Sequence, residues 1–176
     1  MTSYVLASPL VEAMTRQNMQ QKYVSVDSKT PQATLSDHMH GKKGVSIQKA
    51  EQYANSIKDS RLNLEMAQIF FGSIPVMTGT KHQQTPLALD VLQEKESSER
   101  KELKQHVREI LTLSEGELNS EERNVITNYT LEFIDEIVVE VTLLASLADL
   151  LGTTVEQLVA GRLPYLTNIG FMRKGK

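Results

Sequence analysis

The sequence predicts an all-α protein, and three observations support this prediction. Of the 176 residues, 40% are hydrophobic but only 5% are aromatic, and tryptophan is absent. Leu, Ile, Val and Met therefore supply most of the apolar surface, which suits helix-on-helix packing better than sheets built from aromatic and β-branched pairs. Apolar residues also recur at intervals of three and four along much of the chain, the period of a helix that buries one face.

Three short segments open the chain. Ser8 precedes a proline and is expected to cap a helix at about 9–18. The next segment, 19–26, fits either a short helix or a short strand. A third helix is expected to begin at Thr30-Pro31 and to end at Gly41, as a glycine at a helix C-terminus favours.

Two amphipathic helices are predicted to complete a first domain over 1–72. Ser46 is a suitable N-cap for the fourth helix, which extends to Ile57, and the fifth covers SRLNLEMAQIFF and ends at Gly72. Residues 73–86 are rich in Gly, Pro, Thr and Gln, which indicates a linker.

The remaining residues, 87–176, are predicted to form an acidic helical domain. A charged helix covers about 87–112, and a much longer helix runs from an Asn119-Ser120 cap to Leu151. A last helix is expected to begin with a capping box, Thr153 and Glu156, and to end at Gly161. The basic end of the tail is expected to be mobile.

The longest helix has an apolar stripe wider than one neighbouring helix would cover. A helix of about 30 residues is about 45 Å long, and self-association is a natural way to cover such a face. We therefore expect oligomerisation through one set of residues: Ile126, Phe133, Ile137, Val141, Leu144, Leu147 and Leu151.

Charge is unevenly divided along the chain. Residues 1–65 contain eight Lys and Arg against six Asp and Glu, whereas residues 90–160 contain six against sixteen. The two halves are therefore expected to have different surfaces and different roles.

Composition and motifs argue against several classes of protein. The chain has no cysteine for a disulfide, its first residues lack the features of a signal peptide, and its most apolar window, 134–151, is interrupted by four acidic residues. We expect a cytoplasmic protein without a membrane span. No phosphate-binding loop, nucleophile elbow or zinc spacing is present, so we expect neither an enzyme nor a cofactor. His38 and His40 point to different sides of a helix and are not expected to bind one metal ion.

The third helix is unusually polar, and its sequence resembles a known family. Residues 19–57 resemble the helix-turn-helix of the XRE (phage repressor) family, most specifically in QATLSDHMHGK, which resembles the family's recognition helix and the glycine turn after it. Ser25, Ser28 and Lys29 depart from the alanine, apolar residue and glycine that the family favours. The order of a domain of this kind, a linker and an acidic helical half also resembles regulators carried by phages and integrated elements of Gram-positive bacteria.

The resemblance implies a DNA-binding surface, and the chemistry of the residues fits it. A recognition helix presents polar side chains to the major groove and is anchored by apolar ones, here Leu35 with Met39 as a second candidate. Gln32 can pair with adenine, and Ala33 and Thr34 suit thymine methyl groups or neighbouring base edges. The complete predicted set is Gln21, Lys22, Lys29, Thr30, Gln32, Ala33, Thr34, Ser36, Asp37, His38, His40, Lys42 and Lys43.

Within this set the lysines are expected to contact phosphates. Lys42 and Lys43 lie just beyond the helix, while Gln21, Lys22 and Lys29 could flank the groove on its other side. For Asp37 two interpretations remain open, an acceptor for cytosine and an outward-facing charge.

Two functions are compatible with the sequence. The first is a sequence-specific transcriptional regulator that binds double-stranded operator DNA as a dimer or higher oligomer. The second is a helical module that binds another protein, which the modest positive charge of the first half and the acidity of the second keep open.

Overall fold

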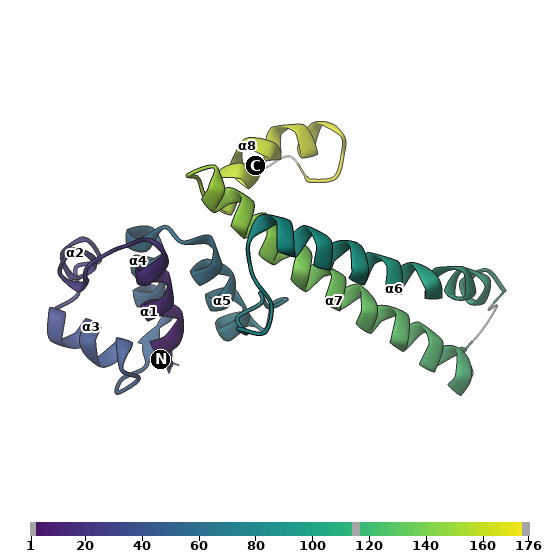
Figure 1. Ribbon diagram of the computed structural model, residues 1–176, viewed down its shortest axis with the longest axis horizontal. Helices are drawn as coiled ribbons and strands as arrows, with labels where there is room; N and C mark the ends of the chain where they lie inside the picture. Colours follow the sequence, from purple (N-terminus) through teal and green to yellow (C-terminus); the bar gives the residue numbers. More distant parts are fainter. Residues whose placement is uncertain (1–2, 114–116, 174–176) are drawn as a thin grey trace. The chain divides into compact units, whose positions relative to one another are not determined.

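The computed structural model describes residues 3–113 and 117–173, and it is all-α as predicted (Figure 1). Eight helices account for 72% of these described residues. The basic end of the tail, for which mobility was expected, lies outside the described residues.

The chain forms two compact units. The first contains residues 1–75 together with 148–176, and the second contains residues 76–147. The linker and domain bounds expected from the sequence stay a prediction.

Five helices in the first unit come from the N-terminal part of the chain. They are α1 (Ala7–Arg16), α2 (Gln21–Asp27), α3 (Gln32–Met39), α4 (Ile47–Ile57) and α5 (Ser60–Phe71). Their apolar faces meet in one core, in which Tyr53 is the largest fully buried side chain. The remaining buried members of this core are Leu6, Leu10, Ala13, Met14, Val24, Leu35, Val45, Ala50, Ile57, Leu62 and Met66.

The ends of these helices follow the sequence in most cases. The Ser46 Oγ accepts a hydrogen bond from the Lys49 backbone N–H, and Gly41 and Gly72 adopt φ values of +68° and +67° beyond α3 and α5. The predicted cap at Ser8 is wrong, because Leu6 precedes the first helical residue and Ser8 lies inside α1. The ambiguous segment 19–26 falls mainly within the helix α2.

A minimal sheet joins the start of the chain to the residues before α4. β1 (Ser3–Tyr4) pairs antiparallel with β2 (Val45–Ser46), with Tyr4 opposite Val45. The Tyr4 ring also packs edge to face on Phe70 of α5, with ring centroids 4.9 Å apart. This arrangement fixes the segment that follows α3.

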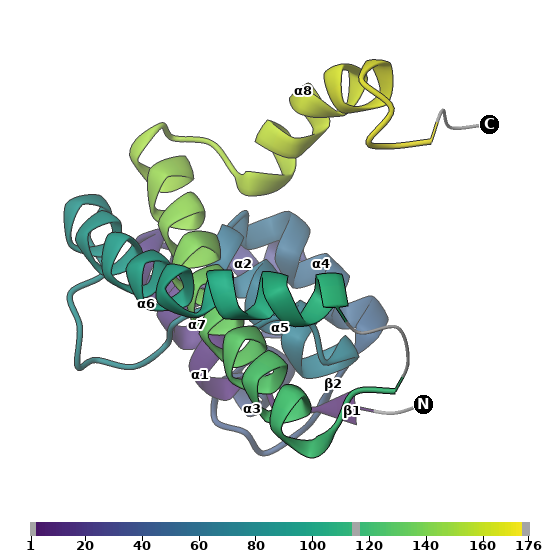
Figure 2. The same ribbon diagram turned by 90° about the vertical axis from the view of Figure 1, so that its right-hand side faces the viewer.

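The second unit is built on a pair of long helices. α6 (Pro86–Leu113) packs against α7 (Ser120–Leu150), and the two run side by side in both views (Figures 1 and 2). Asn119 caps α7 as predicted, since its Oδ1 accepts hydrogen bonds from the backbone N–H groups of Glu121 and Glu122 at 2.9 and 3.0 Å.

A cationic side chain links the two long helices. The Arg100 guanidinium on α6 pairs with the buried carboxylate of Glu136 on α7 and donates to the Tyr129 hydroxyl at 3.1 Å. Its carbon also lies 4.7 Å from the centroid of the Phe133 ring. The Glu136 carboxylate is thus buried in the α6–α7 contact beside a partner of opposite charge, which offsets the cost of removing the carboxylate from water.

The segment before α6 has no regular structure in the second unit, yet it is held against α7. Val76 is buried, and the Met77 backbone N–H donates to the Thr142 Oγ1 at 2.9 Å. Ser146 donates to the Gln84 carbonyl at 3.2 Å. Thr142 and Ser146 of α7 are buried in these contacts. The apolar periodicity of the sequence does not predict their burial, because both residues are polar.

The last helix, α8 (Val155–Asn168), differs from its prediction at both ends. Its capping box consists of Thr154 and Gln157 instead of Thr153 and Glu156. The helix continues through Gly161 and Pro164, so the predicted end at Gly161 is wrong. A glycine inside a helix costs about 1 kcal/mol and a proline about 3 kcal/mol relative to alanine, so the local preference against helix at both positions is overruled here.

No single helix among the described residues is long and apolar enough to cross a membrane. One bent pair, Ser120–Leu150 with Val155–Asn168, reaches the necessary length and composition only when its two helices are taken together.

Candidate nucleic-acid interface

Two short helices and a tight turn position the candidate residues. α2 ends at Asp27 and α3 begins at Gln32, and four residues connect them. The Thr30 backbone N–H donates to the Ser25 carbonyl at 2.9 Å, and the Ser25 hydroxyl donates to the Thr30 carbonyl at 2.7 Å. These two bonds fold the chain back between the helices.

Lys29 takes a conformation in this turn that glycine usually supplies. Its φ is +49°, in the left-handed region that disfavours a residue with a Cβ atom. The backbone of this turn therefore has the geometry that glycine usually adopts, although the residue is a lysine. The exposed side chain instead adds a positive charge beside the start of α3.

A buried cluster of polar side chains stabilises the turn. The Ser28 hydroxyl lies 3.0 Å from the Thr30 Oγ1, and the Thr30 hydroxyl also donates to the Ser28 carbonyl at 3.1 Å. The Lys49 ammonium on α4 donates to the Thr30 Oγ1 at 3.0 Å. Thr30 is 2% exposed, so its side chain stabilises the turn and is not accessible at the surface, unlike the predicted contact to DNA.

α3 is anchored by its inward face. Leu35 is fully buried, and Met39 packs against the same core. His38 is also buried, and its Nδ1 lies 2.7 Å from the Tyr53 hydroxyl oxygen on α4. The expected surface position of His38 is therefore wrong. His38 follows Leu35 by three residues, so both lie on the same helix face. This spacing indicates burial, but the polar character of histidine favoured a surface position.

Burial changes the protonation of this pair. Desolvation lowers the pKa of His38, and the positive charges of Lys49 and Lys43 lower it further. Burial raises the pKa of the Tyr53 hydroxyl, against a smaller effect of its hydrogen bond with Thr30. A neutral imidazole and a protonated phenol are thus favoured under α3.

The outward face of α3 carries most of the remaining candidates. Gln32, Ala33 and His40 are exposed, while Thr34, Ser36 and Asp37 are partly exposed. Gln21 on α2 connects to this face, since its Nε2 donates to the Gln32 carbonyl at 3.1 Å. The structure therefore brings the starts of α2 and α3 together.

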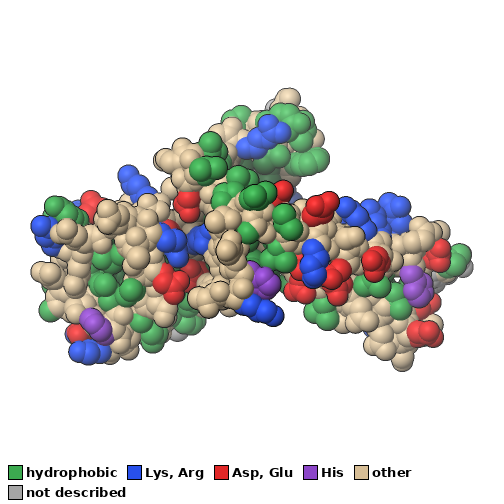
Figure 3. Space-filling view, viewed as in Figure 1, with side chains coloured by type: hydrophobic (Ala, Val, Ile, Leu, Met, Phe, Trp, Pro, Cys, Tyr) green, Lys and Arg blue, Asp and Glu red, His purple; other side chains and the backbone are tan. Residues whose placement is uncertain are grey.

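Lysines border this face, and its one carboxylate is paired. Lys22, Lys29, Lys42 and Lys43 are all exposed. The Lys43 ammonium lies 2.7 Å from the Asp37 carboxylate, and this hydrogen bond lowers the pKa of Asp37. Figure 3 shows basic side chains at several places on the surface of the N-terminal part.

The candidate oligomerisation residues lie on α7 and at its end, and none of them is fully buried. Phe133, Leu144, Leu147 and Leu151 are exposed, and Ile126, Ile137 and Val141 are partly exposed. The residues of α7 that are buried form another set, Glu136, Val139, Thr142, Ala145, Ser146 and Ala148. Large apolar side chains thus remain accessible along α7.

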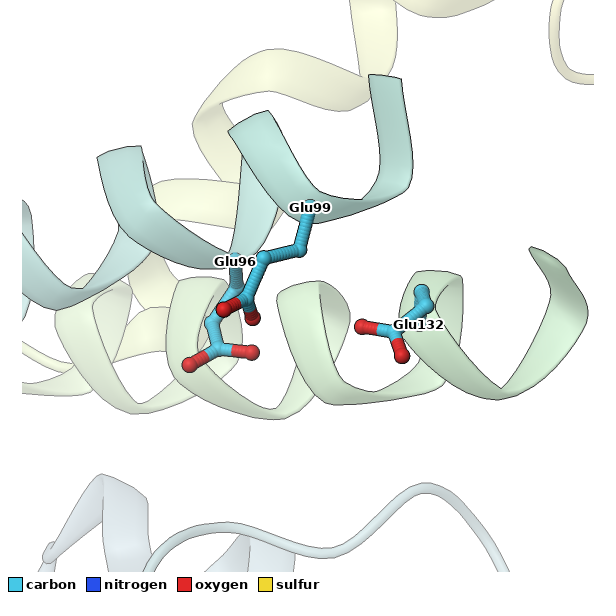
Figure 4. A group of neighbouring side chains, drawn as sticks. All are labelled: Glu96, Glu99 and Glu132. Atoms are coloured by element: carbon cyan, nitrogen blue, oxygen red, sulfur yellow. The ribbon is translucent and has the colours of Figure 1, made fainter. Parts of the chain in front are cut away.

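A group of carboxylates also comes together in the second unit. Oxygen atoms of Glu96 and Glu99 on α6 and of Glu132 on α7 lie within 4.8 Å of one another (Figure 4). The Lys95 ammonium lies 3.2 Å from the Glu96 carboxylate and 3.0 Å from that of Glu99. One ammonium group therefore lies within ion-pair distance of two of the three carboxylates and balances one of their negative charges.

Comparison of the chain with protein-family models, with curated proteins and with solved structures finds no match.

Proposed function

We propose that this protein is a sequence-specific DNA-binding transcriptional regulator that recognises operator DNA through α3. The observation that carries the proposal is an eight-residue helix with a polar exposed face, held on the core by Leu35 and bordered by four exposed lysines. A helix of this kind fits a major groove about 12 Å wide, whose base edges are read by polar side chains. The resemblance of residues 19–57 to phage repressors points to the same function.

The proposal gives the exposed residues two kinds of role. Gln32, Ala33 and Thr34 face base edges, with Ser36 and His40 further along the helix. The surrounding lysines, together with Gln21, contact phosphates on both sides of the groove, so they contribute affinity that falls with salt. Asp37 is held by Lys43, which favours its interpretation as a paired surface charge over a contact to cytosine.

Thr30 and His38 take a different part in this function. Both are buried, and Tyr53 connects them, because its hydroxyl group forms hydrogen bonds with both side chains. They hold the start and the end of α3 in a fixed relation to α4. Their effect on DNA is therefore exerted through the position of α3.

Self-association completes the proposal. The accessible apolar side chains of α7 supply a surface for pairing two copies, and a symmetric dimer reads two half-sites separated by about 10 base pairs or a multiple of this. We infer a regulator of the type carried by phages or integrated elements, which the sequence resembles.

The experiment that tests this function is a footprint and gel shift with genomic fragments at moderate salt. Retention of one fragment more tightly than competitor DNA is expected. Gln32→Ala should reduce the preference for the operator by about 1–3 kcal/mol, whereas Lys42→Ala should weaken binding to all sequences alike. Equal affinity for every fragment would refute sequence-specific recognition.

A protein-binding module is the second candidate, and the strong acidity of residues 90–160 favours it. Recovery of one stoichiometric protein partner in a pull-down, together with no retention of DNA, would support this function over the first.

A further inference from the structure

Both ends of α3 are tied to a single side chain of α4. The Nδ1 atom of His38, in the last turn of α3, lies 2.7 Å from the Tyr53 hydroxyl oxygen. The same hydroxyl group forms a hydrogen bond with the side chain of Thr30, which lies just before α3 begins. Tyr53 is fully buried, and Thr30 and His38 are buried as well. One phenol therefore fixes the position of α3 on the core at two points.

α3 has little stability of its own. It has eight residues, and no side chain caps its N-terminus. An isolated helix shorter than about 12 residues is marginal in water, so packing has to hold it. Leu35 is fully buried near its middle, and Met39 is only partly buried at its end. The hydrogen bond between His38 and Tyr53 thus contributes to docking the last turn of α3.

The surroundings of His38 favour an uncharged imidazole. Desolvation lowers its pKa, and the positive charges of Lys49 and Lys43 lower it further. The Lys49 ammonium donates to the Thr30 Oγ1 at 3.0 Å, so one positive charge already belongs to this cluster. Asp37 acts in the opposite direction, but its carboxylate is paired with the Lys43 ammonium at 2.7 Å.

The other charged side chains of the helices around α3 lie at the surface or in a pair of their own. Arg16 of α1 donates to the buried carboxylate of Asp59 at 2.8 Å. The remaining charged residues of α1, α2 and α4 are exposed, and they are Glu12, Lys22, Asp27 and Glu51. A proton added to docked His38 would therefore place a positive charge in the core beside another one, which costs free energy.

We propose that Tyr53 positions α3 only while His38 is uncharged, so that a proton gained by His38 releases the last turn of α3 and weakens operator recognition. The inference deepens the proposed function, because it rests on α3 as the helix that enters the groove and adds the regulation of that helix by protons. The release of α3 itself does not require DNA.

The direction of the effect follows from the two states of His38. In released α3 the imidazole is in water, with a pKa of about 6.5, whereas in docked α3 the pKa is lower. Between these two values the released form binds one more proton, so its population relative to the docked form rises by up to about tenfold for each unit of falling pH. Above pH 6.5 both forms are neutral, and acidity does not change their ratio.

Hydrogen exchange of the full-length chain tests the release of α3 without DNA. Exchange is followed by mass spectrometry from pH 7.5 to 5 and corrected for the intrinsic rate at each pH. In the wild type the protection of residues 32–39 should fall below pH 6.5 by up to about tenfold per unit, while α5 keeps its protection. In His38→Gln, which has an uncharged polar side chain at all these values, the protection of α3 should not depend on pH.

Two further variants separate the buried pair from its surroundings. His40→Gln removes the exposed histidine of the same helix and should show the same fall in α3 protection as the wild type. Tyr53→Phe keeps the buried ring and removes the hydroxyl group, so α3 should lose protection already at pH 7.5 while α5 does not. Circular dichroism of each variant verifies that the helices are retained.

DNA binding is measured on the same chains. The probe is the genomic fragment retained most tightly in the gel shift, and its affinity is followed by fluorescence anisotropy from pH 7.5 to 5 at constant ionic strength. Wild-type affinity should fall below pH 6.5 more steeply than that of His38→Gln. His106→Gln, which changes an exposed histidine of α6, should follow the wild-type profile.

The inference is overturned if α3 protection in the wild type is independent of pH, if it falls equally in His38→Gln, or if α5 loses protection together with α3. If the fragment binds with the same pH profile in the wild type and in His38→Gln, the link to operator recognition fails while the proposed function stands. If no fragment is retained at any pH while α3 protection follows His38, the proposed function fails and the release of α3 by protons stands.

Discussion

Replacing Lys29 with glycine should stabilise the first unit while weakening its binding to DNA. The φ of +49° puts Lys29 in the left-handed region, which costs a residue with a side chain about 1–2 kcal/mol. Glycine removes this cost but adds about 0.4–1 kcal/mol through the greater freedom of the unfolded chain. The net gain is roughly 0.5–1 kcal/mol, which corresponds to about 2–4 °C in the melting temperature of a unit of this size.

The loss of the ammonium group has a separate effect on DNA. If Lys29 contacts one phosphate, its removal should weaken binding to all sequences and reduce the salt slope by about 0.9. Thermal unfolding followed by circular dichroism gives the stability, and fluorescence anisotropy over a range of salt concentrations gives the slope.

Two matched variants separate strain from charge. Lys29→Ala retains a Cβ atom and loses the charge, so it should bind DNA as weakly as Lys29→Gly without the gain in stability. Lys58→Gly relieves a similar conformation, with φ of +54° at the end of α4, and should stabilise the protein without a change in DNA affinity. Equal melting temperatures for Lys29→Gly and Lys29→Ala would refute the reasoning about strain, and an unchanged salt slope in both would refute the phosphate contact.

Three further predictions concern buried side chains. Leu35→Ala should lower the free energy of unfolding by about 2–5 kcal/mol, measured by urea denaturation, because Leu35 is fully buried under α3. Burial lowers the pKa of His38 from about 6.5, so below that pH the unfolded chain binds a proton that the folded chain does not. Stability should therefore fall as pH decreases from 6.5 through the folded pKa, and a His38→Gln variant should show a weaker dependence in melts between pH 5 and 7. Glu136→Ala should destabilise the second unit by about 3 kcal/mol, because the charge of Arg100 loses its partner. The double variant Arg100→Met with Glu136→Leu should recover most of that loss. Thermal unfolding of the single and the double variant distinguishes these outcomes.

Local sequence signals predicted several helix ends in the N-terminal part of the chain. Glycines at positions 41 and 72 and the serine at position 46 act within one turn of the chain, so their effect depends little on distant residues. The prediction failed at Ser8 and at Gly161, where a favourable local signal was overruled. Helix formation continues past such signals when the flanking residues are already helical, since each added residue gains a hydrogen bond.

The candidate interface could be predicted only in part. The exposed positions of Gln32 and Ala33 follow from the polar character of the segment and its spacing around Leu35. The burial of Thr30 and His38 could not be predicted from local polarity, because it depends on Lys49 and Tyr53, which the fold brings from α4. A polar side chain becomes acceptable in a core only when a distant residue supplies its hydrogen-bond partner.

The sequence by itself determined the helical class, most helix ends and the polar stretch that became α3, because these depend on propensity and on period along the chain. Only the tertiary structure decided which face of α7 packs inward and which side chains of α3 face out. It also showed that Lys29 adopts the conformation of a glycine. These features depend on residues far apart in the sequence, whose packing selects one face or one backbone conformation from several that local chemistry permits.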